Sequence, residues 1–147
     1  MTETLILRTA TFNDFEFAYQ TKKAAMKTYI DEAYGWDEDE QRRLHTQRFN
    51  TTEFRVIQKS GKGVGILSSS RQPDCIKVNQ IYILPEYQNR GIGKEIITLI
   101  IKDAVKLGLL VQLQVLKVNP RAQVFYHRLG FIKTGESETH ILLEKRL

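Results

Sequence analysis

The stretch Gln88-Asn89-Arg90-Gly91-Ile92-Gly93 decides the fold of this chain. It follows the apolar run Ile81-Tyr82-Ile83-Leu84 and precedes residues 94–101, where apolar side chains recur at helical spacing. Two glycines at a helix start allow a tight turn and leave the first backbone N–H groups unblocked. With the helix dipole and the charges of Arg90 and Lys94, these donors suit an anion, most often a phosphate. A plain strand–helix turn is the alternative interpretation.

The order of these residues adds a family resemblance. Gln-x-x-Gly-x-Gly directly after a strand resembles the acyl-CoA loop of the GNAT superfamily of N-acyltransferases, and every fixed position is met. A second block is similar to that family's Asn-x-x-Ala…Phe-Tyr…Gly-Phe segment. It reads Asn119-Pro120-Arg121-Ala122, then Phe125-Tyr126, then Leu129-Gly130-Phe131. The resemblance covers residues 57–147, whereas the N-terminal third matches only in its expected pattern of elements.

Periodicity and turn residues give an expected order of elements. The resemblance implies an α+β protein with the single-domain acyl-CoA N-acyltransferase fold over residues 1–147. In that fold, a mixed sheet of about seven strands is splayed between strands 4 and 5 and flanked by about four helices. The apolar start of residues 109–116 also suggests a strand buried on both faces. We expect strands at 5–10, 53–59, 64–69, 75–84, 109–116, 131–134 and 140–145, and helices at 15–29, 37–49, 91–106 and 120–129.

Composition narrows the class of protein. Hydrophobic residues make up 41% and charged residues 27%, which is ordinary for a soluble globular chain. No apolar run approaches the ~20 residues that span a bilayer, and no signal peptide opens the chain. We therefore expect no membrane partner and a cytoplasmic location. The single cysteine, Cys75, excludes an internal disulfide and is interpreted as a core residue. Three scattered histidines show no ligand spacing, so no metal is expected.

The formal charge of +5 has two interpretations. It fits a basic patch for a polyphosphate ligand together with ordinary solubilising charge. It also fits nucleic-acid binding. No run of Lys or Arg exceeds two residues and no recognition motif is present, so nucleic acid is not an expected partner.

The resemblance implies a donor site for acetyl-CoA, the expected co-substrate. The amides of residues 88–93, with Lys94, would hold the pyrophosphate. The pantetheine arm would lie beside the central strand on main-chain groups of Ile81 and Ile83, and the N–H of Tyr82 or Ile83 would stabilise the oxyanion. Asn119 would bind the arm, although it also suits a helix N-cap.

Tyr126 is the candidate general acid. A phenol has a pKa near 10, so it stays protonated at neutral pH and can give its proton to a departing thiolate. A partly buried core tyrosine is the alternative interpretation. The base is open, because Gln80 stands where many relatives carry a carboxylate. A carboxylate from residues 31–38, a water chain, a substrate that arrives neutral, His45 or His127 would each serve.

The acceptor is expected to be a primary amine of a small molecule or peptide. The resemblance places one wall of its site between the first two helices, where Glu32, Tyr34 and Trp36 are candidates, with Gln80 on the central strand. The final hairpin near residues 136–139 is a second candidate wall. An N-acetyltransferase acting by direct attack through a tetrahedral intermediate is the first interpretation, and a non-catalytic acyl-CoA sensor is the second. The family allows a monomer or a homodimer.

Overall fold

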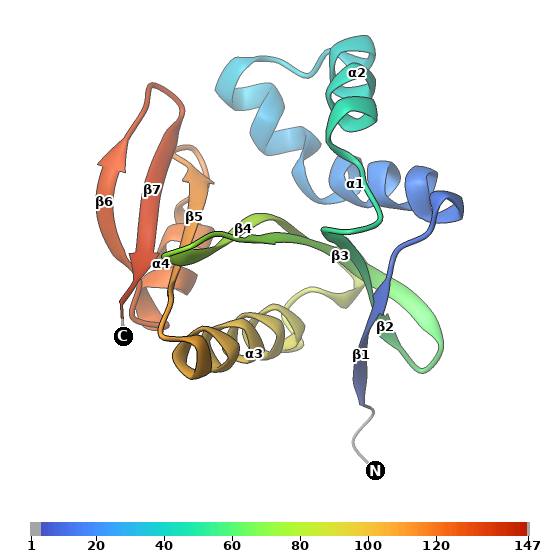
Figure 1. The fold of residues 1–147 in the computed structure, drawn as a ribbon. Coiled ribbons are helices and arrows are strands. Elements are labelled where there is room, and N and C mark those ends of the chain that lie inside the picture. Colours follow the sequence, from blue (N-terminus) through green and yellow to red (C-terminus); the bar gives the residue numbers. More distant parts are fainter. Residues whose placement is uncertain (1–3, 147) are drawn as a thin grey trace.

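The computed structural model describes residues 4–146 and shows one twisted sheet with helices on both faces (Figure 1). The strand order is β1-β2-β3-β4-β5-β7-β6, and all neighbouring pairs are antiparallel except β4 and β5. The strands are β1 (Leu5–Thr9), β2 (Phe54–Lys59), β3 (Lys62–Arg71), β4 (Cys75–Ile83), β5 (Leu110–Leu116), β6 (Ile132–Glu136) and β7 (His140–Lys145). The helices are α1 (Phe15–Tyr34), α2 (Glu38–Arg48), α3 (Ile92–Leu107) and α4 (Pro120–Arg128).

This arrangement confirms the predicted α+β class, its mixed seven-stranded sheet and its four helices. The first helix is longer than predicted, because it runs to Tyr34 instead of ending near residue 29. Gly35 is the residue that ends it, with a φ of 89° that favours glycine. Residues 31–34 therefore form the last turn of α1 and are not a loop.

Helix α3 covers one face of the sheet because its apolar residues follow a helical row. Ile92, Ile96, Ile100 and Ala104 are spaced four apart, and all are buried. They pack on a core that includes Val64 of β3, Val78 of β4, and Val111, Leu113 and Val115 of β5. Burial in β5 alternates along most of the strand, so the expected burial on both faces is wrong. Gln114, on its other side, lines a cavity.

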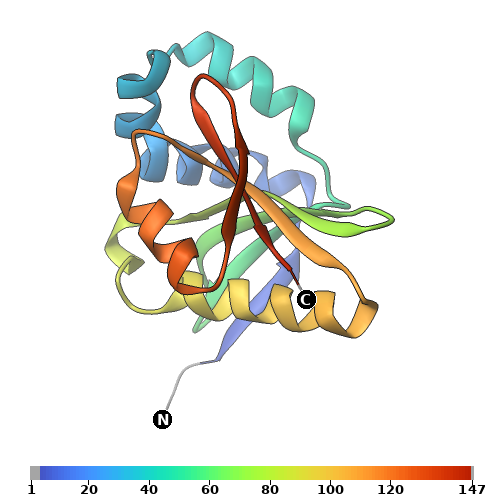
Figure 2. The ribbon, with the colours of Figure 1, turned by 90° about the vertical axis from the view of Figure 1, so that its left-hand side faces the viewer.

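Helices α1 and α2 lie over the opposite face of the sheet (Figure 1). A smaller core there contains Ala18 of α1, Phe54 of β2 and Ile66 of β3. The hairpin of β6 and β7 joins the sheet through β5, and its tip rises toward the helical layer (Figure 2). The two faces of the sheet thus carry different layers, with α3 below and the pair α1–α2 above.

Strands β4 and β5 pair over three residues and then separate. Residues Cys75–Lys77 lie opposite Leu110–Gln112, and no further pairs of the described chain join the two strands. The expected splay between strands 4 and 5 is thus confirmed. One residue of β4, Asn79, is skipped in the register with β3, since Ser68 faces Gln80 and Ser69 faces Val78. Such a bulge bends its strand and re-aims the side chains around it.

Candidate active site

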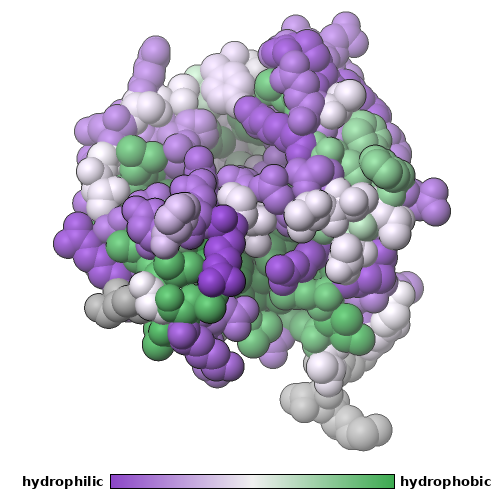
Figure 3. Space-filling model, viewed as in Figure 1, coloured by the Kyte–Doolittle hydropathy of each residue, from purple (hydrophilic) through white to green (hydrophobic). Residues whose placement is uncertain are grey.

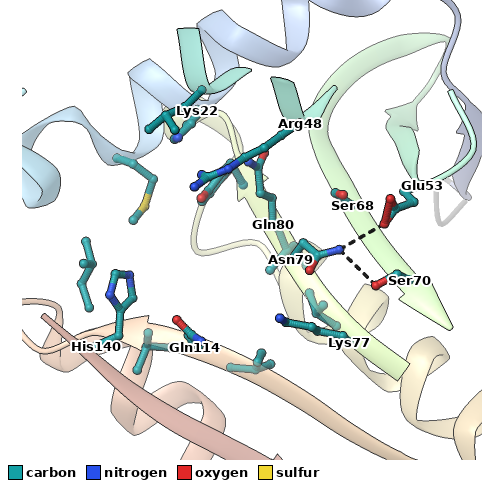
Figure 4. A pocket seen from close by; sticks show the side chains of 18 of the residues that line it. Lys22, Arg48, Glu53, Ser68, Ser70, Lys77, Asn79, Gln80, Gln114 and His140 are labelled. Atoms are coloured by element: carbon teal, nitrogen blue, oxygen red, sulfur yellow. Dashed lines mark hydrogen bonds between the residues drawn. The ribbon is translucent and has the colours of Figure 1, made fainter. Parts of the chain in front are cut away.

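A cavity of about 720 Å³ occupies the region of the splay. Its volume lies in the range of about 300–1,000 Å³ that is usual for small-molecule sites. In the space-filling view a hollow opens in the upper half of the molecule, surrounded mostly by hydrophilic residues (Figure 3). Side chains from α1, α2, β2, β3, β4, β5, α4 and β7 and from the loops between them line the cavity, and ten of the lining residues are labelled in Figure 4.

A second, smaller hollow of about 200 Å³ lies at the glycine-rich loop. Gly91 holds a left-handed conformation with φ 81°, and Asn89 also has a positive φ of 63°. The Gln88 side chain donates to the Ile83 carbonyl at 2.9 Å, which ties the loop to the end of β4. Arg121 donates to the Asn89 side chain at 2.7 Å, which ties it to α4. The conformation of the loop is therefore fixed by hydrogen bonds to β4 and to α4.

The start of α3 forms the floor of this loop hollow. Ile92, Gly93 and Lys94 line it, and the ring of Phe125 closes one side. A Cβ at Gly93 would stand 3.7 Å from the Phe125 ring, which is an ordinary contact. Arg90 does not line the hollow, because its guanidinium lies over the Tyr87 ring, 5.5 Å from the centroid. Free N–H groups at the N-terminus of a 16-residue helix suit a phosphate.

The edge of β4 beyond the splay has main-chain groups directed at the gap. The N–H of Leu84 donates to a carbonyl of β3 at 2.9 Å. Main-chain groups point alternately to the two sides of a strand, so those of Ile81 and Ile83 point away from β3. The bond from Gln88 to the Ile83 carbonyl agrees with that direction. Tyr82 directs its N–H to β3, so the register favours Ile83 as the oxyanion donor.

Asn119 and Tyr126 both reach the cavity from α4. The Asn119 side chain accepts a bond from the Ala122 N–H at 3.2 Å, so its expected N-cap role is confirmed. Tyr126 is 7% exposed and packs edge-on against Phe125 and Phe131. Burial raises the pKa of Tyr126 well above the usual value for a phenol, so the hydroxyl is protonated at neutral pH. Its core contacts hold it beside the gap between β4 and β5.

Gln80 lies in the cavity wall beside the bulge of β4 (Figure 4). Its side chain is 7% exposed, and its Oε1 has no hydrogen-bond partner in the described chain. A buried acceptor without a donor is costly, so a ligand N–H at this place would be stabilised. All the consecutive residues from Lys77 to Tyr82 line the cavity, which therefore extends past both faces of β4 where it separates from β5.

The model of the Acetyltransferase (GNAT) family matches residues 16–131. The chain belongs to the GNAT acetyltransferase family. It is 30% identical over 102 residues to an uncharacterized N-acetyltransferase of Methanocaldococcus jannaschii, a match that covers 64% of this chain and 45% of that relative. The matched stretch thus spans less than half of the length of that relative.

Solved structures share the GNAT fold over nearly the whole chain. A PaiA N-acetyltransferase from Thermoplasma acidophilum, solved in complex with coenzyme A, superposes with a TM-score of 0.80 at 16% identity, covering 98% of this chain and 99% of that one. The ribosomal-protein-S18-alanine N-acetyltransferase from Escherichia coli gives 0.74 at 18% identity, covering 97% and 93%. At these identities the likeness establishes the fold.

The carboxylates of residues 31–38, which are candidates for the general base, lie outside this cavity. Asp31 accepts a bond from the Trp36 N–H at 3.0 Å, and Glu38 accepts one from the Trp36 indole at 2.8 Å. Trp36 itself packs toward Tyr19 between the two N-terminal helices. Of the expected acceptor-wall residues, Tyr34 and Gln80 line the cavity, whereas Glu32 and Trp36 do not. The continuation of α1 through residue 34 explains this, since only one face of the helix looks inward.

His45 and His127, the two histidine candidates for the general base, also lie away from the cavity. His45 is 2% exposed among the rings of Phe15, Phe49 and Tyr19, and its Nε2 lies 2.8 Å from the Phe15 carbonyl. His127 is an exposed residue of α4. A third histidine, His140 of β7, lines the cavity and was not singled out from the sequence.

His140 has the properties of a neutral proton acceptor. Its Nδ1 lies 2.8 Å from the Thr139 hydroxyl, which orients the ring. Burial lowers the pKa of His140 below 6.5, so the imidazole is uncharged at neutral pH. No local sequence pattern marks this residue, because only the pairing of β7 with β5 brings it to the cavity opposite Leu116.

Lys22 and Arg48 are two further cavity residues that the sequence interpretation missed. Lys22 stands four residues after Ala18 and four before Met26, in the row of α1 that faces inward. A lysine in an otherwise apolar helical row was the signal available in the sequence. Lys22 is only 5% exposed. Arg48 is the last residue of α2 and reaches over the same space (Figure 4).

Residues 4–146 contain neither a metal-binding cluster nor a membrane-spanning helix. No group of three or more His, Cys, Asp or Glu side chains is arranged to hold a metal ion in that part of the chain. No helix within the same residues is long and apolar enough to cross a membrane. Cys75 is 1% exposed with its thiol near Gln72 and Gln112, which confirms the interpretation as a core residue.

Proposed function

We propose that this GNAT domain transfers the acetyl group of acetyl-CoA to a primary amine by direct attack. One observation supports this most strongly. The loop hollow and the larger cavity lie along the same unpaired edge of β4, where Ile83 lines the first and Ile81 the second. A long, thin donor with a phosphate at one end and a thioester at the other fits such a path.

The loop would hold the donor by its pyrophosphate. The N–H groups at the start of α3 and the ammonium of Lys94 supply dipole and charge at one place. The outward main-chain groups of Ile81 would then bind the pantetheine arm as a neighbouring strand would. Asn119 faces the same gap and is held by its own N-cap bond.

The chemical step requires a donor for the oxyanion and a proton for the leaving sulfur. As the amine nitrogen attacks the thioester carbon, the carbonyl oxygen gains charge that the Ile83 N–H would stabilise. When the C–S bond breaks, the Tyr126 hydroxyl would give its proton to the thiolate. The products are an N-acetylated amine and free CoA.

The amine must also lose a proton, and we assign its acceptor to His140. This imidazole lines the same cavity and is neutral at neutral pH. The unpaired Oε1 of Gln80 would orient the amine by accepting one of its N–H bonds. After transfer, the protonated imidazole and the Tyr126 phenolate return to their starting forms through solvent.

Substitution of Tyr126 by Phe tests this function. General acid catalysis contributes about 10²–10⁴-fold, so Tyr126→Phe should lower kcat at least about 100-fold in an assay of CoA thiol release with a panel of primary amines. Binding of acetyl-CoA should stay within about twofold, because the ring is kept. Tyr82→Phe is the matched control, since it removes another phenol of the same cavity. Full turnover by Tyr126→Phe would refute the assignment.

A non-catalytic acyl-CoA sensor is the second candidate. It is favoured by one observation, the absence of a free carboxylate among the described residues of the cavity. Glu53 is the carboxylate there, and Asn50 and Asn79 donate to it at 3.1 and 3.5 Å. A sensor would bind acetyl-CoA while the unmodified protein released no thiol with any amine.

A further inference from the structure

Three cationic side chains line the acceptor half of the cavity. Lys22 enters from α1, Arg48 from α2 and Lys77 from β4 (Figure 4). None of the three makes a side-chain hydrogen bond or ion pair with another residue of the described chain. Glu53 is the one carboxylate among the described lining residues, and it is turned toward Asn79 (Figure 4).

Lys22 is the decisive residue of this group. It is 95% buried, yet it has no carboxylate partner within the described chain. Burial lowers the pKa of Lys22 to about 8, and the charge of Arg48 lowers it in the same direction. Two like charges at one wall of a cavity, one of them buried, are unfavourable unless something negative joins them.

Lys22 and Arg48 lie where they could bind one end of an acceptor whose amine reaches the acetyl donor. Arg48 also acts electrostatically on Tyr82, which stands on β4 between the cavity and the loop hollow. The cationic pair is thus on the side of the helical layer, whereas Tyr126 and Asn119 reach the cavity from α4. A ligand anion at the pair would leave the other end of the same molecule near Gln80 and the acetyl donor.

We propose that the acceptor is an amine that also carries an anionic group, a carboxylate or a phosphate, and that Lys22 and Arg48 bind this group. This inference rests on the proposed acetyl transfer and adds the chemical class of the substrate. Arg48 offers a planar fork that matches either anion, and Lys22 adds a point charge that burial strengthens. An acceptor with a second cationic end, such as a polyamine, would be repelled.

The test compares four amines of similar length with CoA bound to the protein. They are 5-aminopentanoate, its amide, 1,5-diaminopentane and 4-aminobutylphosphonate, each titrated calorimetrically. The carboxylate and the phosphonate should bind at least roughly tenfold more tightly than the amide and the diamine. Comparing the two anions tells a carboxylate site from a phosphate site. A tetrapeptide with Glu in second position, against its Gln counterpart, tells an acidic peptide from a free small amine.

Variants of Lys22 and Arg48 test whether these two side chains cause the preference for anionic amines. Lys22→Met and Arg48→Met should each remove most of the preference for anionic amines. Lys22→Arg should keep this preference, because arginine retains the positive charge. Thermal unfolding checks that each variant is folded. The proposal is overturned if the amide or the diamine binds as tightly as the anions. It is equally overturned if the preference survives both methionine variants, or if no anion binds.

The same samples separate this inference from the proposed function. Titration with acetyl-CoA and the assay of thiol release test the acetyltransferase itself. Failure of acetyl-CoA to bind would refute the proposed function. Acetyl-CoA binding with equal affinity for charged and neutral acceptors would refute the anionic acceptor alone.

Discussion

Lys22 is a charged side chain at a position where stability alone favours an apolar one. Its neighbours in the same row of α1, Ala18, Met26 and Ile30, are apolar. Burial lowers the pKa of Lys22 from 10.5 to about 8. The folded protein therefore binds this proton less tightly than the unfolded chain does, and the charged form is destabilising. Such a cost is typical of residues retained for function.

Replacing Lys22 by Met should make the protein more stable and a poorer enzyme. One pKa unit corresponds to about 1.4 kcal/mol, so the free energy of unfolding at pH 7 should rise by about 3–4 kcal/mol in urea titrations. The gain is greatest below pH 8, where Lys22 is charged in both states, and disappears as pH rises toward 10.5. Lys27→Met, at an exposed position of α1, should change stability by less than about 0.5 kcal/mol. A less stable Lys22→Met at pH 7 would contradict this account.

The pH dependence of turnover should report His140. Its pKa lies below 6.5, so the imidazole accepts a proton at pH 7 and loses this ability as pH falls through that pKa. We expect His140→Gln to lower kcat/KM at pH 7 by about 100-fold. The ratio of wild type to variant cancels the titration of the amine, and it should shrink toward one as pH falls through the pKa of His140. A ratio near one at every pH would exclude His140 as the base.

At the scale of elements, the glycine-rich loop is the part that the sequence predicted best. A strand, a turn and a helix start are local features, and Gly91 does adopt the left-handed conformation that its place suggests. The predicted helix 15–29 ends five residues before α1 does, because the local sequence pattern does not mark where the helix stops. Gly35 was the breaker, and the residues before it stay helical.

The two ends of α3 allow a matched test of the loop. Gly91 and Gly108 both have positive φ, 81° and 69°, and a Cβ at either would meet no atom within 4 Å. Alanine at either position should therefore cost a similar amount of stability, about 1–2 kcal/mol. Only Gly91→Ala distorts the loop hollow, so only it should weaken acetyl-CoA binding in titrations. Equal affinities for the two variants would argue against a phosphate site there.

At the scale of the whole molecule, the cavity follows from a short parallel ladder. Strands β4 and β5 share three paired positions, and the bulge at Asn79 bends β4 where they part. The space between them is closed by α1 and α2 above and by β7 at the side. Eight elements thus contribute walls, and none is sufficient alone.

This construction explains which site residues the sequence could and could not predict. Asn119, Tyr126 and the loop residues lie in contiguous blocks that resemble a family pattern. Lys22, Arg48 and His140 come from three distant elements, and no spacing rule relates them before the chain is folded. The resemblance assigns Glu32 and Trp36 to the acceptor wall through the segment between the first two helices, but the helical rotation of α1 and the turn after it direct them elsewhere.

Thermal unfolding with acetyl-CoA and with free CoA tests the central claim, an acyl-CoA donor site in this fold, most directly. A ligand at about 100 times its dissociation constant stabilises a fold by roughly 2.7 kcal/mol. For a domain of this size, that should raise Tm by roughly 5–10 °C. We predict a rise with both ligands that Gly91→Ala diminishes and Gly108→Ala does not. An unchanged Tm at millimolar acetyl-CoA would contradict the claim.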